Sequence, residues 1–220
     1  MRRTMAKAAF HTALNLLFFA TVGTALLALT YNLTRDRIAY SEEQEKLKLI
    51  RQIVPVSEYD NDIMKDFITV AADDMLGNDH DTVAYRGRLK QAPSVAVLQA
   101  TAPEGYGGNI RFVIAIHFDG SIGGVRVVSH QETPGLGDYI EIAKNDWINV
   151  FSGKSLQSLK DADWKVKKDG GRFDYIAGAT ISPRAMIKAV HKAMQYFQEH
   201  RDELFGQVPA HQLNDKEKRK

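Results

Sequence analysis

The chain has 220 residues, 44% of them hydrophobic, which is long enough to bury one sizeable core, so one main domain is expected. It has no cysteine, which excludes disulfides, thiol nucleophiles, thiolate-bound iron–sulfur clusters and covalent haem, and fits an oxidising compartment. The formal net charge of +2, without one long basic stripe, gives no indication of nucleic-acid binding.

An uncharged apolar run occupies residues 13–31, with the sequence ALNLLFFATVGTALLALTY. As a helix it would be roughly 28 Å long, close to the thickness of a hydrocarbon core. Arg2, Arg3 and Lys7 precede it, and the first acidic residue is Asp36. Because basic flanks favour the cytoplasmic side, the sequence predicts a membrane-spanning helix with a cytoplasmic N-terminus and the remaining chain across the membrane.

A cleaved signal peptide is the alternative interpretation of this segment, because it also combines a basic start with an apolar core. The run is long, however, and no clean small-residue cleavage site with a polar approach follows it. Residues 25–28 (ALLA) come nearest to such a site. We therefore favour an uncleaved anchor.

A helical stalk is predicted after the span. Ile38, Leu47, Ile50 and Val54 recur at helical spacing, and Pro55 ends the pattern. The predicted organisation is a cytoplasmic N-terminus (1–12), a transmembrane helix (13–31), the stalk (32–54), a folded domain (55–208) and a charged tail (209–220).

Alternating apolar residues in the folded domain predict strands at residues 82–88, 94–101, 109–118 and 122–129, with a tight turn at Asp119-Gly120. The third strand places one apolar set on one face: Ile110, Phe112, Ile114, Ile116 and Phe118. Its other face carries Arg111 and His117. A short helix from about Asp138 and a longer one from Pro183 to His200 follow. The predicted class is α+β, an antiparallel sheet with packed helices.

The sequence DYIAGATISP (residues 174–183) places a threonine, Thr180, just before the last predicted helix. Gly178 and Ala179 leave space around its hydroxyl. We expect Ser182 to be the N-cap and Pro183 the first helical residue. Free amides at such a helix start can bind a phosphate. Taken alone, Gly-Ala-Thr before a helix is also a common turn with a hydroxyl cap.

Two further segments accompany this turn: GYGG (residues 105–108) and HQETPGLGD (residues 130–138). In this order and spacing, the three segments resemble the FMN-binding domain family. The resemblance implies that Thr180 carries FMN through a phosphoester bond and that Asp174 is the upstream acidic residue of the attachment pattern. One difference is Ala177, where that pattern usually has Ser or Thr. The resemblance also implies a set of residues around the flavin: Gly178, Ala179, Glu132, Thr133, Leu136, Gly137 and Tyr106.

With the anchor, the whole layout resembles the G subunits of Rnf (Rsx) ion-translocating electron-transport complexes. That resemblance implies an electron relay in a bacterial inner membrane, with the main domain in the periplasm. Its partners would be other membrane and redox subunits and a flavin transferase. Two alternatives stay open: a C subunit of a sodium-translocating NADH:quinone reductase, and a cofactor-free anchored assembly module. There is no Walker loop, HExxH or dinucleotide fingerprint, so neither a metal site nor direct NAD binding is predicted.

Overall fold

The computed structural model describes residues 2–206, without the side chains of 2–9, 36, 39–43, 45 and 46. The tail predicted at 209–220 lies outside the described residues. The first element is α1 (Arg2–Ile53), a continuous helix. Within it, Phe10–Arg35 has a mean hydropathy of 1.9 and is long and apolar enough to cross a membrane. The span predicted at 13–31 falls inside this segment.

Threonine hydroxyls in this apolar segment bond to the helix itself. Thr21 donates to Leu17 O at 2.7 Å, and Thr30 donates to Leu26 O at 2.9 Å. A hydroxyl that donates to the carbonyl four residues earlier needs no water. Its presence in the segment is therefore compatible with a hydrocarbon environment.

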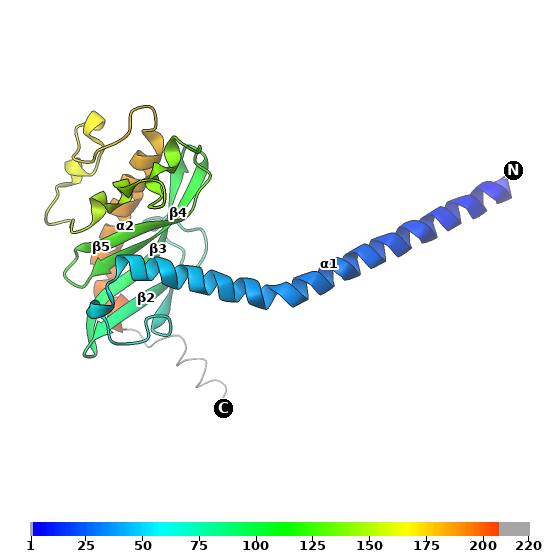
Figure 1. Cartoon of the computed structure of the whole chain (residues 1–220), viewed down its shortest axis with the longest axis horizontal. Helices are drawn as coiled ribbons and strands as arrows, with labels where there is room; N and C mark the ends of the chain where they lie inside the picture. Colours follow the sequence, from blue (N-terminus) through cyan, green and yellow to red (C-terminus); the bar gives the residue numbers. More distant parts are fainter. Residues whose placement is uncertain (1, 207–220) are drawn as a thin grey trace. The chain divides into compact units, whose positions relative to one another are not determined.

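A five-stranded antiparallel sheet forms the centre of the folded unit that begins at Leu47. The strands follow the chain in order (Figure 1): β1 (Phe67–Val70), β2 (Thr82–Leu89), β3 (Ala92–Gly105), β4 (Gly108–His117) and β5 (Ile122–Ser129). The four predicted strands are confirmed within a few residues, and β1 is an additional edge strand that the sequence analysis missed.

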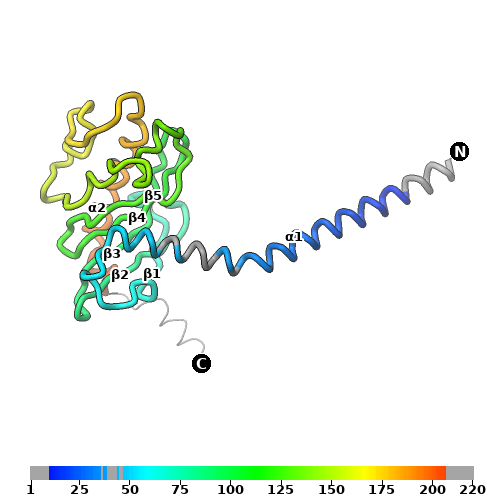
Figure 2. Tube along the Cα trace, viewed as in Figure 1, coloured from blue at the N-terminus to red at the C-terminus, as the bar shows by residue number. Residues whose placement is uncertain are grey.

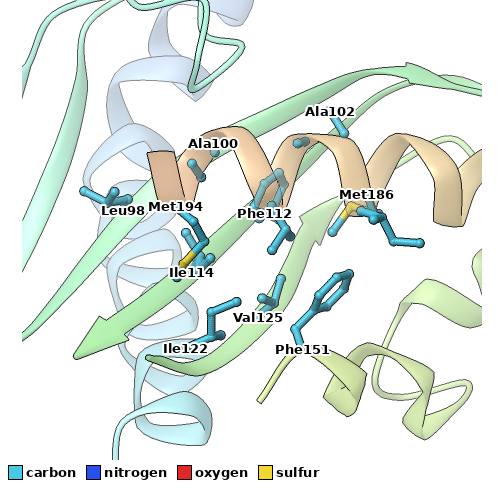
Figure 3. Close-up of a cluster of buried hydrophobic side chains, with 14 of the residues drawn as sticks. Leu98, Ala100, Ala102, Phe112, Ile114, Ile122, Val125, Phe151, Met186 and Met194 are labelled. Atoms are coloured by element: carbon cyan, nitrogen blue, oxygen red, sulfur yellow. The ribbon is translucent and has the colours of Figure 1, made fainter. Parts of the chain in front are cut away.

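The main core lies between one face of this sheet and α2 (Ile181–Gly206). Met186 and Met194 of α2 point toward Phe112 and Ile114 of β4 in Figure 3, and all four are at most 2% exposed. The two methionines therefore fill the core between the helix and the sheet. The apolar stripe of α2 thus determines the face on which it packs.

A second core covers the opposite face of the sheet, which the alternating pattern had not indicated. Ile50 and Ile53, in the last turns of α1, are buried there with Val113 and Ala115 of β4. Gly124 permits this contact, because a Cβ at that position would lie 2.8 Å from Ile53 Cγ2. The folded unit therefore includes the end of the predicted stalk, from Leu47 onward.

The chain between β5 and α2 contains only short 3₁₀ helices and runs beside β5 (Figure 2). It pairs with that edge strand: Ile122 N donates to Lys154 O at 2.8 Å, and Gly153 N donates to Ile122 O at 2.7 Å. The 3₁₀ helices of this segment are η2 (Gly137–Ile140), η3 (Asp146–Phe151), η4 (Asp161–Asp163) and η5 (Lys167–Asp169). One more, η1 (Val56–Glu58), precedes β1. The predicted short helix near Asp138 is η2.

An ion cluster closes the C-terminal end of α2. Arg86, which is fully buried, lies 2.6 Å from Asp66 Oδ1 and donates to Leu204 O at 3.0 Å. Arg88 donates to Asp66 Oδ2 at 2.8 Å and to Phe205 O at 3.0 Å. Burial lowers the pKa of Arg86, and the negative charge of Asp66 opposes that shift.

Candidate functional site

A tight turn precedes α2 and contains the predicted attachment residue. Ala179 N donates to Ile176 O at 3.1 Å, closing a turn across residues 176–179. Gly178, at the third position, has φ of +88°, a conformation that side-chain-bearing residues rarely adopt. Ala177, at the second position, is exposed. The turn therefore requires glycine at position 178 and ends directly before Thr180.

Thr180 immediately precedes the first residue of α2, Ile181. It is half-buried, and its hydroxyl makes no hydrogen bond with any residue between 2 and 206. Its carbonyl oxygen accepts from Arg184 N at 3.3 Å. Over the same range, the amides of Thr180, Ile181 and Ser182 have no backbone acceptor. One hydroxyl and three amides at a helix start are therefore available to a ligand.

The predicted helix start was wrong by two residues, since Thr180, and not Ser182, occupies the N-cap position. Ser182 is 2% exposed, and its hydroxyl donates to Glu132 Oε2 instead of capping the helix. Pro183 lies inside the first turn, where its missing amide hydrogen costs nothing.

The three predicted segments meet at the carboxylate of Glu132, which is 4% exposed. Its Oε1 accepts from Gly107 N at 3.0 Å, and its Oε2 accepts from Ser182 Oγ. Its own amide donates to His130 Nδ1 at 3.0 Å, which leaves the proton of a neutral His130 on Nε2. One buried side chain thus joins the turn between β3 and β4, the loop after β5, and the start of α2.

Two glycines make this junction possible. A Cβ at Gly107 would lie 1.9 Å from Gln131 O. A Cβ at Gly137 would lie 2.7 Å from Ser182 Oγ and 2.8 Å from Glu132 Oε2. Neither position has room for a side chain, so both glycines serve a close approach of segments.

A second buried side chain, Tyr139, holds the turn from the other side. Its hydroxyl donates to Ala179 O at 3.0 Å and accepts from Ile176 N at 3.3 Å. Burial raises its pKa. Trp147 packs edge-on against it, with ring centroids 5.5 Å apart, and donates from Nε1 to Asp174 O at 2.7 Å. Sequence analysis missed both aromatics, and only their position after the predicted loop could have pointed to them.

The other predicted residues lie at the surface. Tyr106 is 70% exposed and Leu136 is 52% exposed, and Thr133 is exposed as well. The loop that carries Leu136 is fixed by buried Asp138, whose Oδ1 accepts from Gly135 N at 2.9 Å. Asp174 is exposed and lies 2.5 Å from Lys167 Nζ. The structure therefore divides the predicted site residues into exposed ones and the buried ones that hold the turn before Thr180.

A groove of about 630 Å³ runs along the first turns of α2. Ile181, Arg184 and His191 line it from the helix, and Trp164 and Asp169 are among the residues opposite. Arg184 donates to Asp169 at 2.6 and 2.7 Å, and this bond lowers the pKa of Asp169. Among residues 2–206, no three His, Asp or Glu side chains gather to hold a metal ion.

Comparison with known proteins agrees with this arrangement. Residues 105–195 match the family model for the FMN-binding domain, and residues 2–53 match the model for the RnfG N-terminal region. The first match contains Glu132, Tyr139 and Thr180.

The chain is also similar to curated proteins over most of its length. The G subunit of the ion-translocating oxidoreductase complex of Aliivibrio fischeri (strain MJ11) is 44% identical, with 93% of this chain and 95% of the relative covered. The G subunit of Pseudomonas aeruginosa (strain UCBPP-PA14) is 44% identical, with 95% and 96% covered. That of Shewanella oneidensis (strain MR-1) is 40% identical, with 87% and 91% covered. The chain therefore belongs to the family of G subunits of ion-translocating oxidoreductase complexes, and its folded unit contains an FMN-binding domain.

Proposed function

We propose that this chain is a flavoprotein subunit that carries FMN on Thr180 through a phosphoester bond and relays electrons within an ion-translocating oxidoreductase complex. The observation that carries the proposal is the free hydroxyl of Thr180 beside three free amides at the start of α2. A phosphate there would accept hydrogen bonds from these amides and lie at the positive end of the helix dipole. These groups fit FMN.

The attachment requires a separate transferase, because a threonine hydroxyl is a weak nucleophile. The donor must carry FMN through a phosphoanhydride. The hydroxyl oxygen of Thr180 forms the new bond to the phosphorus of FMN. The phosphoanhydride bond breaks, the second phosphate of the donor leaves with the bonding electron pair, and the hydroxyl proton passes to a base on the transferase. Exposed residues near the turn, including Asp174, Gly178 and Thr133, are available for contact with that enzyme.

Around the cofactor, we assign the exposed side chains of Tyr106 and Leu136 to contact with the isoalloxazine ring. Gly137, Ala179 and Glu132 form the buried side of the site. FMN supplies the redox chemistry, and the protein orients it. A covalent bond prevents the cofactor from being lost by dissociation on a side of the membrane where little free flavin is present.

The wider role follows from the family. We infer that the subunit passes electrons between neighbouring redox subunits of a complex that couples ferredoxin and NAD chemistry to cation transport. The helix segment Phe10–Arg35 anchors it in the bacterial inner membrane, with the N-terminus in the cytoplasm and the folded unit in the periplasm. The relatives are named as G subunits of ion-translocating oxidoreductase complexes and not as quinone-reductase subunits, which favours an Rnf-type complex over the quinone reductase.

The attachment is tested with Thr180→Ala. We expect the protein, produced with a flavin transferase, to lose all fluorescence in a denaturing gel and all added flavin mass. Thr180→Ser, which keeps a hydroxyl at the same place, should retain both and serves as the matched control. Flavin that survives denaturation in Thr180→Ala would show that the site is elsewhere, and a flavin-free wild-type protein would favour the cofactor-free assembly module.

The orientation is tested with single cysteines, because the natural chain has none. A cysteine at exposed Lys168 should react with a membrane-impermeant thiol reagent in intact spheroplasts, and one at Thr4 should react only after lysis. The reason is the basic segment on one side of an uncharged span. Labelling of Thr4→Cys alone in intact spheroplasts would mean that the topology is the reverse.

A further inference from the structure

The backbone around Thr180 is held by two buried side chains from the same part of the chain. Tyr139 bonds to Ile176 N and Ala179 O, just before the threonine. Glu132 accepts from Ser182 Oγ, two residues after it. Both are nearly inaccessible, at 5% and 4% exposure. Neither side chain bonds to Thr180 itself.

We propose that Glu132 and Tyr139 are positioning residues that hold the Thr180 hydroxyl in the geometry required for transfer of the flavin phosphate. This inference rests on the function proposed above and adds the residues that make the hydroxyl competent. Fixing the backbone on both sides leaves the nucleophile free while limiting its motion. Because transfer rates depend on placement within about 1 Å, such braces can control the rate without any contact to the reacting atoms.

The same arrangement explains why one of two neighbouring hydroxyls is chosen. The Ser182 hydroxyl is buried and donates to Glu132, so it is withheld from solvent and from an enzyme. Thr180 is half-buried and has no hydrogen-bond partner for its hydroxyl among residues 2–206. Glu132 therefore both steadies the turn and removes the competing nucleophile.

Glycines 107 and 137 show that this contact is built into the fold. Each lies against the Glu132 segment or Ser182 at a distance that excludes a Cβ, as described above. Because of this close packing, the position of the Glu132 carboxylate depends on all three segments. A substitution at Glu132 is therefore expected to change the turn even though its side chain is out of reach of the transferase.

The experiment measures single-turnover flavin transfer to the full-length protein in detergent, with saturating transferase and donor. Ser182→Ala and Tyr139→Phe, each of which removes one hydroxyl, should slow transfer by roughly tenfold, and Glu132→Ala by up to about 100-fold. The concentrations of transferase and donor that give half the maximal rate should stay unchanged, because the side chains of Glu132, Tyr139 and Ser182 are buried and do not contact the transferase. Glu132→Gln should recover a rate within about threefold of wild type, since its amide can accept from Gly107 N and donate to Ser182 Oγ.

Asn61→Ala is the matched control, because Asn61 also joins distant segments: it donates to Arg86 O at 3.0 Å and accepts from Arg88 N at 2.8 Å. It should lower the melting temperature without slowing transfer. Should Glu132→Ala fail to fold, the two hydroxyl deletions decide the question. Wild-type transfer rates in both of them, or a rate loss that Asn61→Ala shares, would overturn the proposal.

Amide hydrogen exchange on flavin-free protein separates this inference from the proposed function. Exchange at the hydrogen-bonded amides of the turn, those of Ile176, Ala179 and Arg184, should be faster in Ser182→Ala and Tyr139→Phe than in wild type and in Asn61→Ala. If the wild-type protein accepts no flavin, the proposed function fails. Unchanged exchange in the two variants would then refute the braces independently.

Discussion

The two ends of α2 differ in how their backbone groups are satisfied. At the C-terminal end, Arg86 and Arg88 donate to the carbonyls of Leu204 and Phe205, and Asp66 balances their charge. At the N-terminal end, the amides beside Thr180 have no backbone partner among residues 2–206. One end is closed by the protein's own cations, and the other is left open to an anion.

Helix electrostatics account for both arrangements. The negative end of the dipole is stabilised by guanidinium groups, and the positive end by a phosphate or carboxylate. Here the buried carboxylate at the N-terminal end, Glu132, bonds to the side chain of Ser182 and leaves the amides free. Within the described part of the chain, the helix therefore has its carbonyls bonded to cations at one end and its amides without backbone partners at the other.

The largest expected effect is at the closed end. Asp66→Ala leaves the fully buried Arg86 without its carboxylate, which should lower the free energy of unfolding by about 3–5 kcal/mol. Denaturant titration measures this loss. Asp62→Ala, which removes an exposed ion pair with Lys65, should change stability by less than about 1 kcal/mol. Equal effects of the two variants would mean that the buried cluster contributes no more than a surface pair.

A medium effect is expected at the open end. Gly137→Ala puts a Cβ 2.7 Å from Ser182 Oγ, which should cost about 1–3 kcal/mol and also slow flavin transfer. Gly206→Ala, at the closed end, has no atom within 4 Å of the new Cβ and should be neutral or slightly stabilising. Thermal melting and gel fluorescence measure the two properties. Normal flavin content in Gly137→Ala would argue against the tight junction at Glu132.

The smallest effect concerns His191, which lies between the two ends. Burial against Trp164, with ring centroids 4.9 Å apart, lowers its pKa from 6.5, and Asp161 opposes this shift. The unfolded state therefore binds the proton more readily. The stability that His191 contributes is complete above about pH 6.5 and decreases as the pH falls through the folded-state pKa.

Denaturant midpoints between pH 7.5 and 5 measure this dependence. His191→Gln should flatten the curve relative to wild type. A wild-type curve that is already flat, or that rises toward low pH, would contradict the assigned direction.

Much of the sheet could be predicted from the sequence. The β5 strand was predicted with its observed bounds, because alternation and the Asp119-Gly120 turn are local signals. β1 was missed because it is short and pairs only at the edge, from Phe67 opposite Tyr85 to Val70 opposite Thr82. The second core was missed because Val113 and Ala115 are buried by the distant residues Ile50 and Ile53.

At the candidate site, the sequence by itself determined which segments belong together and which residue is the candidate for attachment. Gly178 has the positive φ that the turn requires locally. Thr180 was identified by the resemblance of the three segments to the FMN-binding domain family, because Gly-Ala-Thr before a helix is by itself a common turn. Only the tertiary structure decided that the Ser182 hydroxyl is hydrogen bonded and that, among residues 2–206, the Thr180 hydroxyl is not. That difference depends on Glu132, 50 residues before Ser182 in the chain, and no local pattern encodes which hydroxyl a distant carboxylate will bind.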